Sequence, residues 1–134
     1  MSSFTAQLIL VAEPEERGGR GVFRVHQAFT YEVGHLGSGD VVTVPAGFRT
    51  DLCSIPAIAR PFVPIAGRMA KPGLIHDWLL EIGDPRAHDI FDEALGVAGV
   101  PRFTRTAMVL AVCLWARWRE FRKLRPDPAP LSAP

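Results

Sequence analysis

The chain has 134 residues, which fits one domain at the roughly 100–200 residues of a typical domain. Its 48% hydrophobic and 22% charged residues are close to globular averages, and they exclude a disordered, collagen-like or coiled-coil protein. Fifteen basic and 14 acidic residues give a net charge of +1, which argues against a nucleic-acid-binding protein.

The near-neutral total hides an uneven distribution of charge along the chain. Residues 1–101 carry 8 basic and 12 acidic side chains, whereas residues 102–125 carry seven basic side chains and only one acidic one. The chain is therefore an acidic body followed by a basic C-terminal segment. We expect this segment to contact an acidic neighbour or an anionic surface.

The cysteines and the N-terminus bear on the cellular compartment. Cys53 and Cys113 stand among apolar residues, so we expect two buried free thiols rather than a disulfide scaffold. The first ten residues lack the charged start and long apolar core of a signal peptide. Thirteen of the 15 basic residues are arginine, a bias typical of GC-rich bacterial or phage genomes. We expect synthesis in the cytoplasm of a bacterial host.

The first third of the chain predicts short β-strands. Thr5–Val11 is expected to be the first strand and to end at the following Glu-Pro-Glu-Glu. Further strands are expected over residues 22–25, 29–33 and 41–44, with glycine-rich turns between them. Short strands joined by local turns favour a small antiparallel sheet.

Residues 45–68 predict a long loop. Pro45, Pro56, Pro61 and Pro64 exclude long regular structure, although many of the residues between them are apolar. A long apolar loop must pack against the rest of the protein, and long ordered loops often carry function.

Helices are expected in the remainder of the chain. The first covers residues 72–80, with a proline in its first turn and a glycine after its end. The second begins with Asp84 as N-cap, followed by Pro85, and ends before Gly99.

The third helix begins within residues 101–104 and runs to about Leu124, and residues 126–134 form a proline-rich tail. The pattern predicts an α+β fold, with a small N-terminal antiparallel β-sheet, a long apolar loop and three C-terminal helices. Residues 1–125 would form a single domain.

Two stretches concentrate reactive side chains. Residues 44–56, with the sequence VPAGFRTDLCSIP, contain Asp51 and Ser54. The first helix carries His76 and Asp77, and the second carries Asp89.

These residues resemble a small family of phage and prophage proteins of unknown function. Its pattern is V-P-x-G-F-x-T-D-x-x-S-I-P, then H-D-x-L, then R-x-x-D-x-x-F and G-V before a last helix. The chain matches it at residues 44–56, at His76 and Asp77, at Arg86 and Asp89, and at residues 99–100. Phe91 stands one position before the phenylalanine of the pattern, and the resemblance covers about residues 20–120. Two departures are Leu80, where the family often has Tyr, and a histidine at position 88, where it usually has Ala. The resemblance implies a phage context rather than a particular reaction.

A second likeness is to secreted phospholipases A2, which place a His-Asp pair on one helix and an Asp on an antiparallel helix. It implies that His76 is a general base, that Asp77 is a metal ligand and that Asp89 orients the imidazole. The chain lacks that family's disulfides and glycine-rich calcium loop. At about 100° per residue, Asp89 also lies almost opposite the apolar face of its helix.

Each of these residues also has a structural interpretation. His76 and Asp77 would be held in the interior by hydrogen bonds to backbone groups, and Asp51 and Ser54 would stabilise loop turns. Ser54 lacks the G-x-S-x-G surroundings of a nucleophile elbow. Asp51 and Asp77 together are candidate ligands for a divalent metal, the one cofactor that the sequence suggests.

The last helix combines aromatic and basic residues. Its apolar run, Ala107–Ala116, is about half of the roughly 20 residues needed to cross a bilayer, so we expect no transmembrane segment. A core helix with a solvated end is one interpretation. The other is a partner-binding surface made of Arg117, Trp118, Arg119, Arg122, Lys123 and Arg125.

Two functions are therefore expected. The first is a phage or prophage particle protein, tail- or baseplate-associated, which is incorporated into the virion and contacts other structural proteins or its own copies through the basic helix and the proline-rich tail. The alternative is a hydrolase acting on envelope lipid or peptidoglycan, with His76 as base and Asp51, Asp77 or Asp89 assisting.

Overall fold

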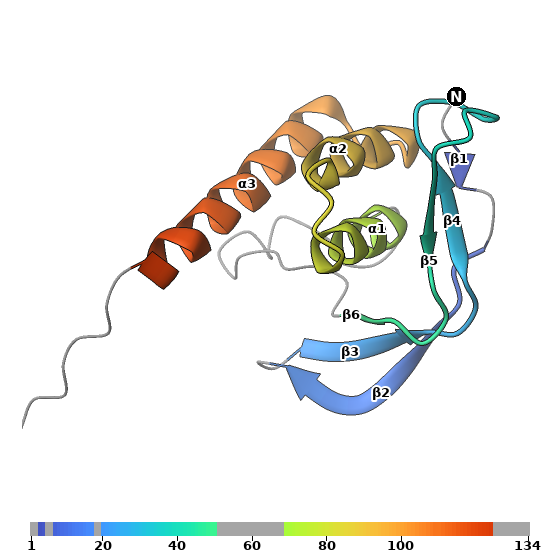
Figure 1. Ribbon diagram of the computed structural model, residues 1–134, viewed down its shortest axis with the longest axis horizontal. Helices are drawn as coiled ribbons and strands as arrows, with labels where there is room; N and C mark the ends of the chain where they lie inside the picture. The colour runs from blue at the N-terminus through green and yellow to red at the C-terminus, as the bar shows by residue number, and fades with distance from the viewer. Residues whose placement is uncertain (1–2, 5–6, 18–19, 51–68, 125–134) are drawn as a thin grey trace, which may run out of the picture.

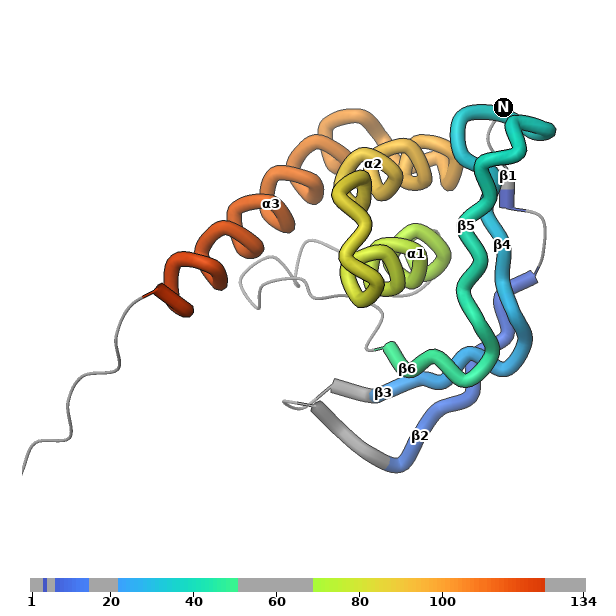
Figure 2. Tube along the Cα trace, viewed as in Figure 1, coloured from blue at the N-terminus to red at the C-terminus, as the bar shows by residue number. Residues whose placement is uncertain are grey.

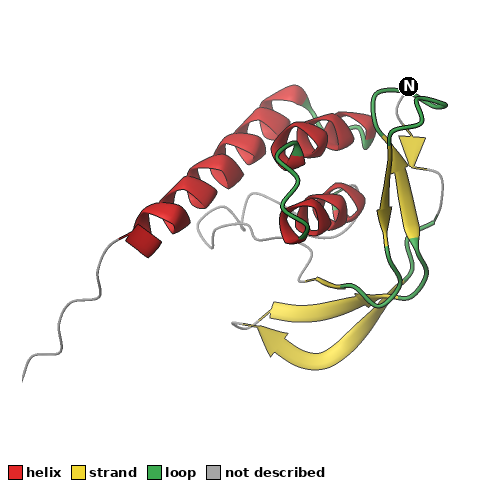
Figure 3. Ribbon diagram, viewed as in Figure 1, coloured by secondary structure: helices red, strands yellow, loops and turns green. Residues whose placement is uncertain are grey.

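The computed structural model describes residues 3–4, 7–17, 20–50 and 69–124. Within these residues, short antiparallel strands are followed by three helices, which confirms the α+β prediction. The helices lie on one side of the strands (Figures 1 and 3). The strands are β1 (Ser3–Phe4), β2 (Leu10–Arg17), β3 (Arg20–Val25), β4 (Phe29–Glu32), β5 (Val41–Val44) and β6 (Arg49–Thr50).

The strands form two small sheets rather than one. Their orders are β1-β4-β5 and β2-β3-β6, and every neighbouring pair is antiparallel. The sheets meet at an angle (Figure 2), and the chain returns from β5 in one sheet to β6 in the other. Phe23 of β3 faces Thr50 of β6, so the start of the predicted loop is held by a strand.

Alternating side chains decide which face of the β4–β5 hairpin is buried. Phe29 and Tyr31 of β4 are fully buried, and Val42 and Val44 of β5 are buried opposite them. Successive side chains of a strand point to opposite faces, so these four residues form one apolar surface. That surface packs against the helices.

The first long strand differs from the prediction. We expected Thr5–Val11, but the strand is β2, Leu10–Arg17, and it includes Pro14. A proline is tolerated there because β2 is at the edge of its sheet, and its pairing with β3 shifts register between Ala12 and Glu16. The Glu-Pro-Glu-Glu sequence therefore marks a bulge and not the end of a strand.

The helices are α1 (Ala70–Glu81), α2 (Ala87–Val97) and α3 (Arg102–Leu124). Gly83 and Gly99 follow α1 and α2 with φ angles of 70° and 81°, the left-handed conformation typical of a helix C-terminus. Asp84 is not the N-cap of α2. Its Oδ1 accepts the backbone N–H of Arg86 at 2.8 Å, so it stabilises the turn before the helix.

The core has two parts. In the first, α1 lies between the two sheets and α2, and its residues Leu74, Ile75 and Leu79 are completely buried or nearly so. The second joins α2 to the first half of α3 through Phe91, Leu95, Met108 and Val112, among others. The two clusters fix α1 firmly and α3 only along its first half.

Several predictions lie outside the described residues: most of the long loop with Asp51, Cys53 and Ser54, and the segment from Arg125 onward with the proline-rich tail. Cys113 is half-buried and free, which departs from the fully buried thiol that we expected. In the described part of the chain, no helix is long and apolar enough to cross a membrane.

Candidate functional site

His76 lies in the interior between α1 and α2. Six of the 12 residues of α1 are buried, as is typical of a helix that is covered on several sides. The His76 side chain is only 4% exposed, and its ring lies 4.5 Å from the ring of Phe91, centre to centre. Its Nε2 is 3.1 Å from Nδ1 of His88 on α2.

The surroundings keep His76 neutral. Burial, followed by repulsion from His88, lowers its pKa from 6.5 to about 4. In the hydrogen bond between the two rings, one nitrogen donates and the other accepts. The sequence placed His76 on the flank of its helix, whereas the structure buries it with Nε2 engaged.

Asp77 points to a different neighbour from His76. Thr50, which is 4% exposed at the end of β6, donates its hydroxyl hydrogen to Oδ2 of Asp77 over 2.6 Å. Near this bond, Phe48 packs edge-on against Trp78 with ring centres 5.2 Å apart. Asp77 therefore accepts a side-chain hydroxyl, and this contact fastens β6 to α1.

Asp89 is exposed on α2. Among the described residues, Nε2 of His76 bonds to His88 and not to Asp89. On a helical wheel Asp89 lies on the side of its helix that faces away from the apolar residues, so the sequence predicts its exposure. The His76–His88 pair was harder to foresee, because that contact depends on how α1 and α2 are rotated against each other.

The described residues do not form a metal centre. They contain no group of three or more His, Cys, Asp or Glu side chains that could hold an ion. Of the two expected ligands, Asp77 is bonded to Thr50, and Asp51 lies outside the described residues together with Ser54. The catalytic roles expected for these residues remain predictions.

Other charged residues hold elements together. Glu93 of α2 accepts the hydroxyl of Tyr31 at 2.7 Å and the N–H of Gly34 at 2.9 Å, which fixes α2 to the turn after β4. Arg86 bonds Asp40 across 2.7 Å at the other end of the same loop. We did not anticipate the partners of these residues from the sequence, since they are distant along the chain.

A second group of functional candidates lies on α3. We call residues 113–124 its distal half, because this part extends beyond α1 and α2 (Figure 1). The buried residues of α3, Met108 and Val112, both precede it. The distal half presents the exposed cations Arg117, Arg119, Arg122 and Lys123, and Glu120 is its one acidic residue.

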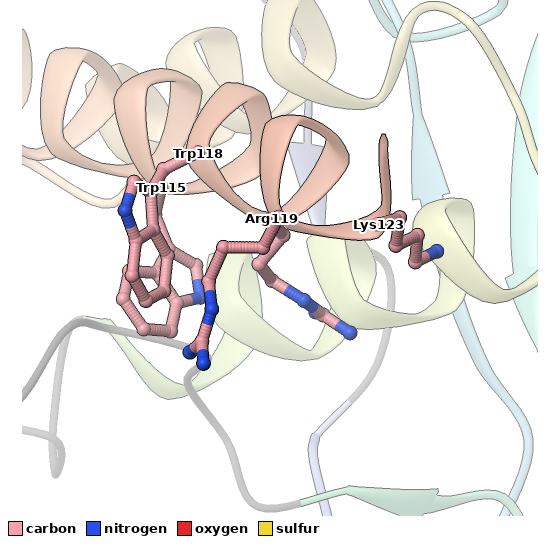
Figure 4. Close-up of a pocket in the computed structure, with 5 residues that line it drawn as sticks. Trp115, Trp118, Arg119 and Lys123 are labelled. Atoms are coloured by element: carbon pink, nitrogen blue, oxygen red, sulfur yellow. The ribbon is translucent and has the colours of Figure 1, made fainter. Parts of the chain in front are cut away.

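The distal half also forms an open hollow of about 360 Å³, which we call the cationic hollow. Trp115 and Trp118 stack with ring centres 4.8 Å apart, and the guanidinium carbon of Arg122 lies 4.7 Å from the centre of the Trp118 ring. Arg119 and Lys123 extend from the same stretch of helix (Figure 4).

Most of the expected partner-binding residues are thus brought together. The structure groups Trp118, Arg119, Arg122 and Lys123 around the cationic hollow. Arg117 is exposed but does not line the hollow, and Arg125 lies outside the described residues.

The chain belongs to the family described as protein of unknown function (DUF1353), whose model matches residues 23–112. No curated protein and no solved structure matches the chain. The matched region ends at Val112, the last buried residue of α3. The distal half therefore lies outside the part that this chain shares with the family model.

Proposed function

We propose that this protein is a component of a phage or prophage particle, associated with the tail or baseplate. The distal half of α3 would dock it on an acidic, partly apolar surface of a neighbouring subunit. The observation that carries the proposal is the cationic hollow, a cluster of stacked indole rings and basic side chains on a helix end that leaves the body of the molecule.

The chemistry of the hollow suits a protein partner. Tryptophan and arginine are enriched where protein interfaces carry most of their binding energy. Trp118 is 43% exposed although it is stacked on Trp115, so it has apolar area still to bury. Arg122 is held over the Trp118 ring, which fixes the position of its guanidinium for a carboxylate.

Charge favours an acidic neighbour. The distal half carries four cations and one carboxylate, so the basic groups are concentrated on one element rather than spread over the surface. A concentrated positive field speeds association with an acidic surface and orients it. By contrast, Arg105 near the start of α3 is already neutralised by Asp92, at 2.6 Å.

The phage context rests on the sequence. Residues 44–56 and 76–79 carry the motifs that resemble phage and prophage proteins, and the arginine-rich composition agrees with such a source. The motif residues that the structure describes serve the fold: Asp77 bonds Thr50, and Arg86 bonds Asp40. We therefore assign particle contacts to α3 and not to these motifs.

The hydrolase is the weaker proposal. A general base must reach a water molecule or a substrate, but His76 is 4% exposed and its Nε2 is engaged by His88. A buried histidine pair that links two helices fits a structural role.

Mass spectrometry of purified virions tests the proposal, using a phage or induced prophage that encodes this chain. We expect the chain in particles that have been washed at moderate salt, and its release at high salt, because screened charges weaken the contact. Complete absence of the chain from particles at low salt would refute the proposal. A host-cell protein of similar abundance serves as the control for contamination.

A further inference from the structure

An exposed apolar stripe runs along the length of α3, next to the side that carries the cationic hollow. Five large apolar side chains form it, and all are well exposed: Phe103 (88%), Leu110 (57%), Leu114 (65%), Phe121 (61%) and Leu124 (82%). The helix has 23 residues and spans about 35 Å. Soluble monomers rarely leave an apolar surface of this length uncovered.

The spacing of the stripe is that of a helix-pairing surface. From Phe103, alternating steps of four and three residues reach Ala107, Leu110 and Leu114, then Arg117, and then Phe121 and Leu124. Arg117 is the one charged residue in this series. At about 100° per residue these side chains fall within a narrow arc. Such a repeat is typical of helices that pack lengthwise against another helix.

The stripe is separate from the surface that packs on the core. Met108 and Val112, the buried residues of α3, lie roughly opposite Leu110 and Leu114 around the helix. The helix thus has two apolar faces, and α2 covers only one of them. In Figure 1, α3 forms an edge of the molecule.

We propose that the stripe of α3 pairs with the same stripe of a second copy of this chain, antiparallel, with the two-fold axis near Leu114. This residue is close to the middle of the helix. An antiparallel pairing about it places Phe121 of one copy opposite the small Ala107 of the other, and Leu124 close to Phe103. Large side chains then meet small ones or the helix ends, as close packing requires.

Charge selects the antiparallel orientation. Arg117 occupies one position of the stripe, and Arg119, Arg122 and Lys123 follow it in the same half of the helix. A parallel pair would bring these cations against their own copies, which is unfavourable. In an antiparallel pair the two basic halves lie at opposite ends, and the helix dipoles also oppose each other.

The pairing leaves most of the cationic hollow open for docking. Trp115, Arg119 and Lys123 lie toward the other side of α3, and only Trp118 adjoins the stripe, so a dimer would present two hollows, one from each copy. Two linked sites bind a repeated acidic surface more tightly than one site does. Dimerisation can be tested on the purified chain, so its outcome does not depend on the proposed particle function.

Light scattering after gel filtration gives the first test, over a series of protein concentrations. The full chain should have twice the 14.7 kDa mass of one copy. Leu114→Glu should halve that mass, because it places two carboxylates against each other at the axis. Leu36→Glu is the matched control, since Leu36 is an exposed leucine (56%) in the turn between β4 and β5, and it should leave the dimer intact. Circular dichroism checks that each variant is folded.

Cross-linking gives the orientation, in a background with Cys53→Ser and Cys113→Ser. Leu114→Cys should be joined to its copy by a short bis-maleimide, whereas Phe103→Cys should not, since antiparallel pairing separates the two copies of position 103. A monomer at all concentrations, or a dimer unaffected by Leu114→Glu, would overturn the proposal. So would cross-linking at position 103 without cross-linking at position 114. Binding of a monomeric chain to anionic vesicles through this stripe would assign it to a membrane surface and also overturn the pairing.

Discussion

The helices α1 and α3 use their apolar residues in opposite ways. Half of the 12 residues of α1 are buried between the sheets and α2, whereas α3 has 23 residues and buries only Met108 and Val112. The side chains with the most familiar catalytic chemistry, His76 and Asp77, are on the helix that is held inside. In this protein His76 and Asp77 therefore belong to a tightly packed helix, and the helix that is packed along only part of its length offers the contact surfaces.

Leucine truncations on the two helices should give the largest contrast. Leu79→Ala on α1 removes a side chain that is 1% exposed, so we expect the free energy of unfolding to fall by about 2–5 kcal/mol. Leu110→Ala on α3 removes an exposed one, and the change should stay within about 0.5 kcal/mol. Urea denaturation at concentrations low enough to keep the chain monomeric measures both. Equal losses would mean that α3 belongs to the core as much as α1 does.

The pH dependence of stability should come next in size. The unfolded chain binds a proton on His76 below pH 6.5, but the folded chain does so only below about pH 4. The contribution of neutral His76 to stability is therefore fully present above pH 6.5. The free energy of unfolding decreases as the pH falls from 6.5 toward 4, by about 3 kcal/mol at 1.4 kcal/mol per pH unit.

A variant isolates the contribution of His76 to this pH dependence. His76→Gln should flatten the decrease in stability between pH 6.5 and 4, whereas His26→Gln, which changes an exposed histidine, should leave it unaltered. Denaturation curves at several pH values provide the measurement. A slope unchanged in His76→Gln would show that the histidine is not buried as described.

A smaller loss should follow when the bond between β6 and α1 is broken. Thr50→Val keeps the shape of a buried side chain but removes the donor to Asp77, which should cost about 1.5–3 kcal/mol, as expected for a hydrogen bond to a charged group. If Asp77→Asn is made first, the added cost of Thr50→Val should shrink. Additive losses in this double-mutant cycle would argue against a direct bond.

The smallest effect is expected at the contact between α2 and α3. An added Cβ at Gly96 would meet the Nη1 atom of Arg105, whose guanidinium makes two bonds to Asp92. Gly96→Ala must displace this flexible side chain, but alanine favours the helix by up to about 1 kcal/mol. The two effects oppose each other, so thermal unfolding should shift little. Arg105→Ala combined with Gly96→Ala should then be more stable than Arg105→Ala alone.

The sequence predicted the helices better than the strands, for local reasons. Gly83 and Gly99 end α1 and α2 through backbone conformations that glycine adopts easily, and these signals stand in the sequence. The sequence predicts the wrong bounds for β2 because proline ends a strand in most contexts. Here the edge position of β2 and a bulge accommodate Pro14. Edge position is a property of the sheet and not of the local sequence.

The candidate site was predictable only in part, for a tertiary reason. The reactive residues could be named, but the partners of His76 and Asp77 depend on how α1 packs against α2 and β6. The basic end of α3 was visible in the charge distribution. The 3–4 spacing of its exposed stripe is also present in the sequence, but only the structure shows which of the two apolar faces α2 covers.

A charge reversal in the cationic hollow distinguishes a docking surface from a merely solvated helix end. The measurement is the number of copies of this chain per virion, by quantitative mass spectrometry, for Arg122→Glu and for Arg102→Glu. Arg122 lines the hollow, whereas Arg102 is an exposed arginine at the other end of the same helix. We expect Arg122→Glu to reduce incorporation at least about tenfold, which corresponds to ~1.4 kcal/mol, and Arg102→Glu to have little effect. Equal incorporation of both variants would contradict the assignment of particle contacts to the distal half of α3.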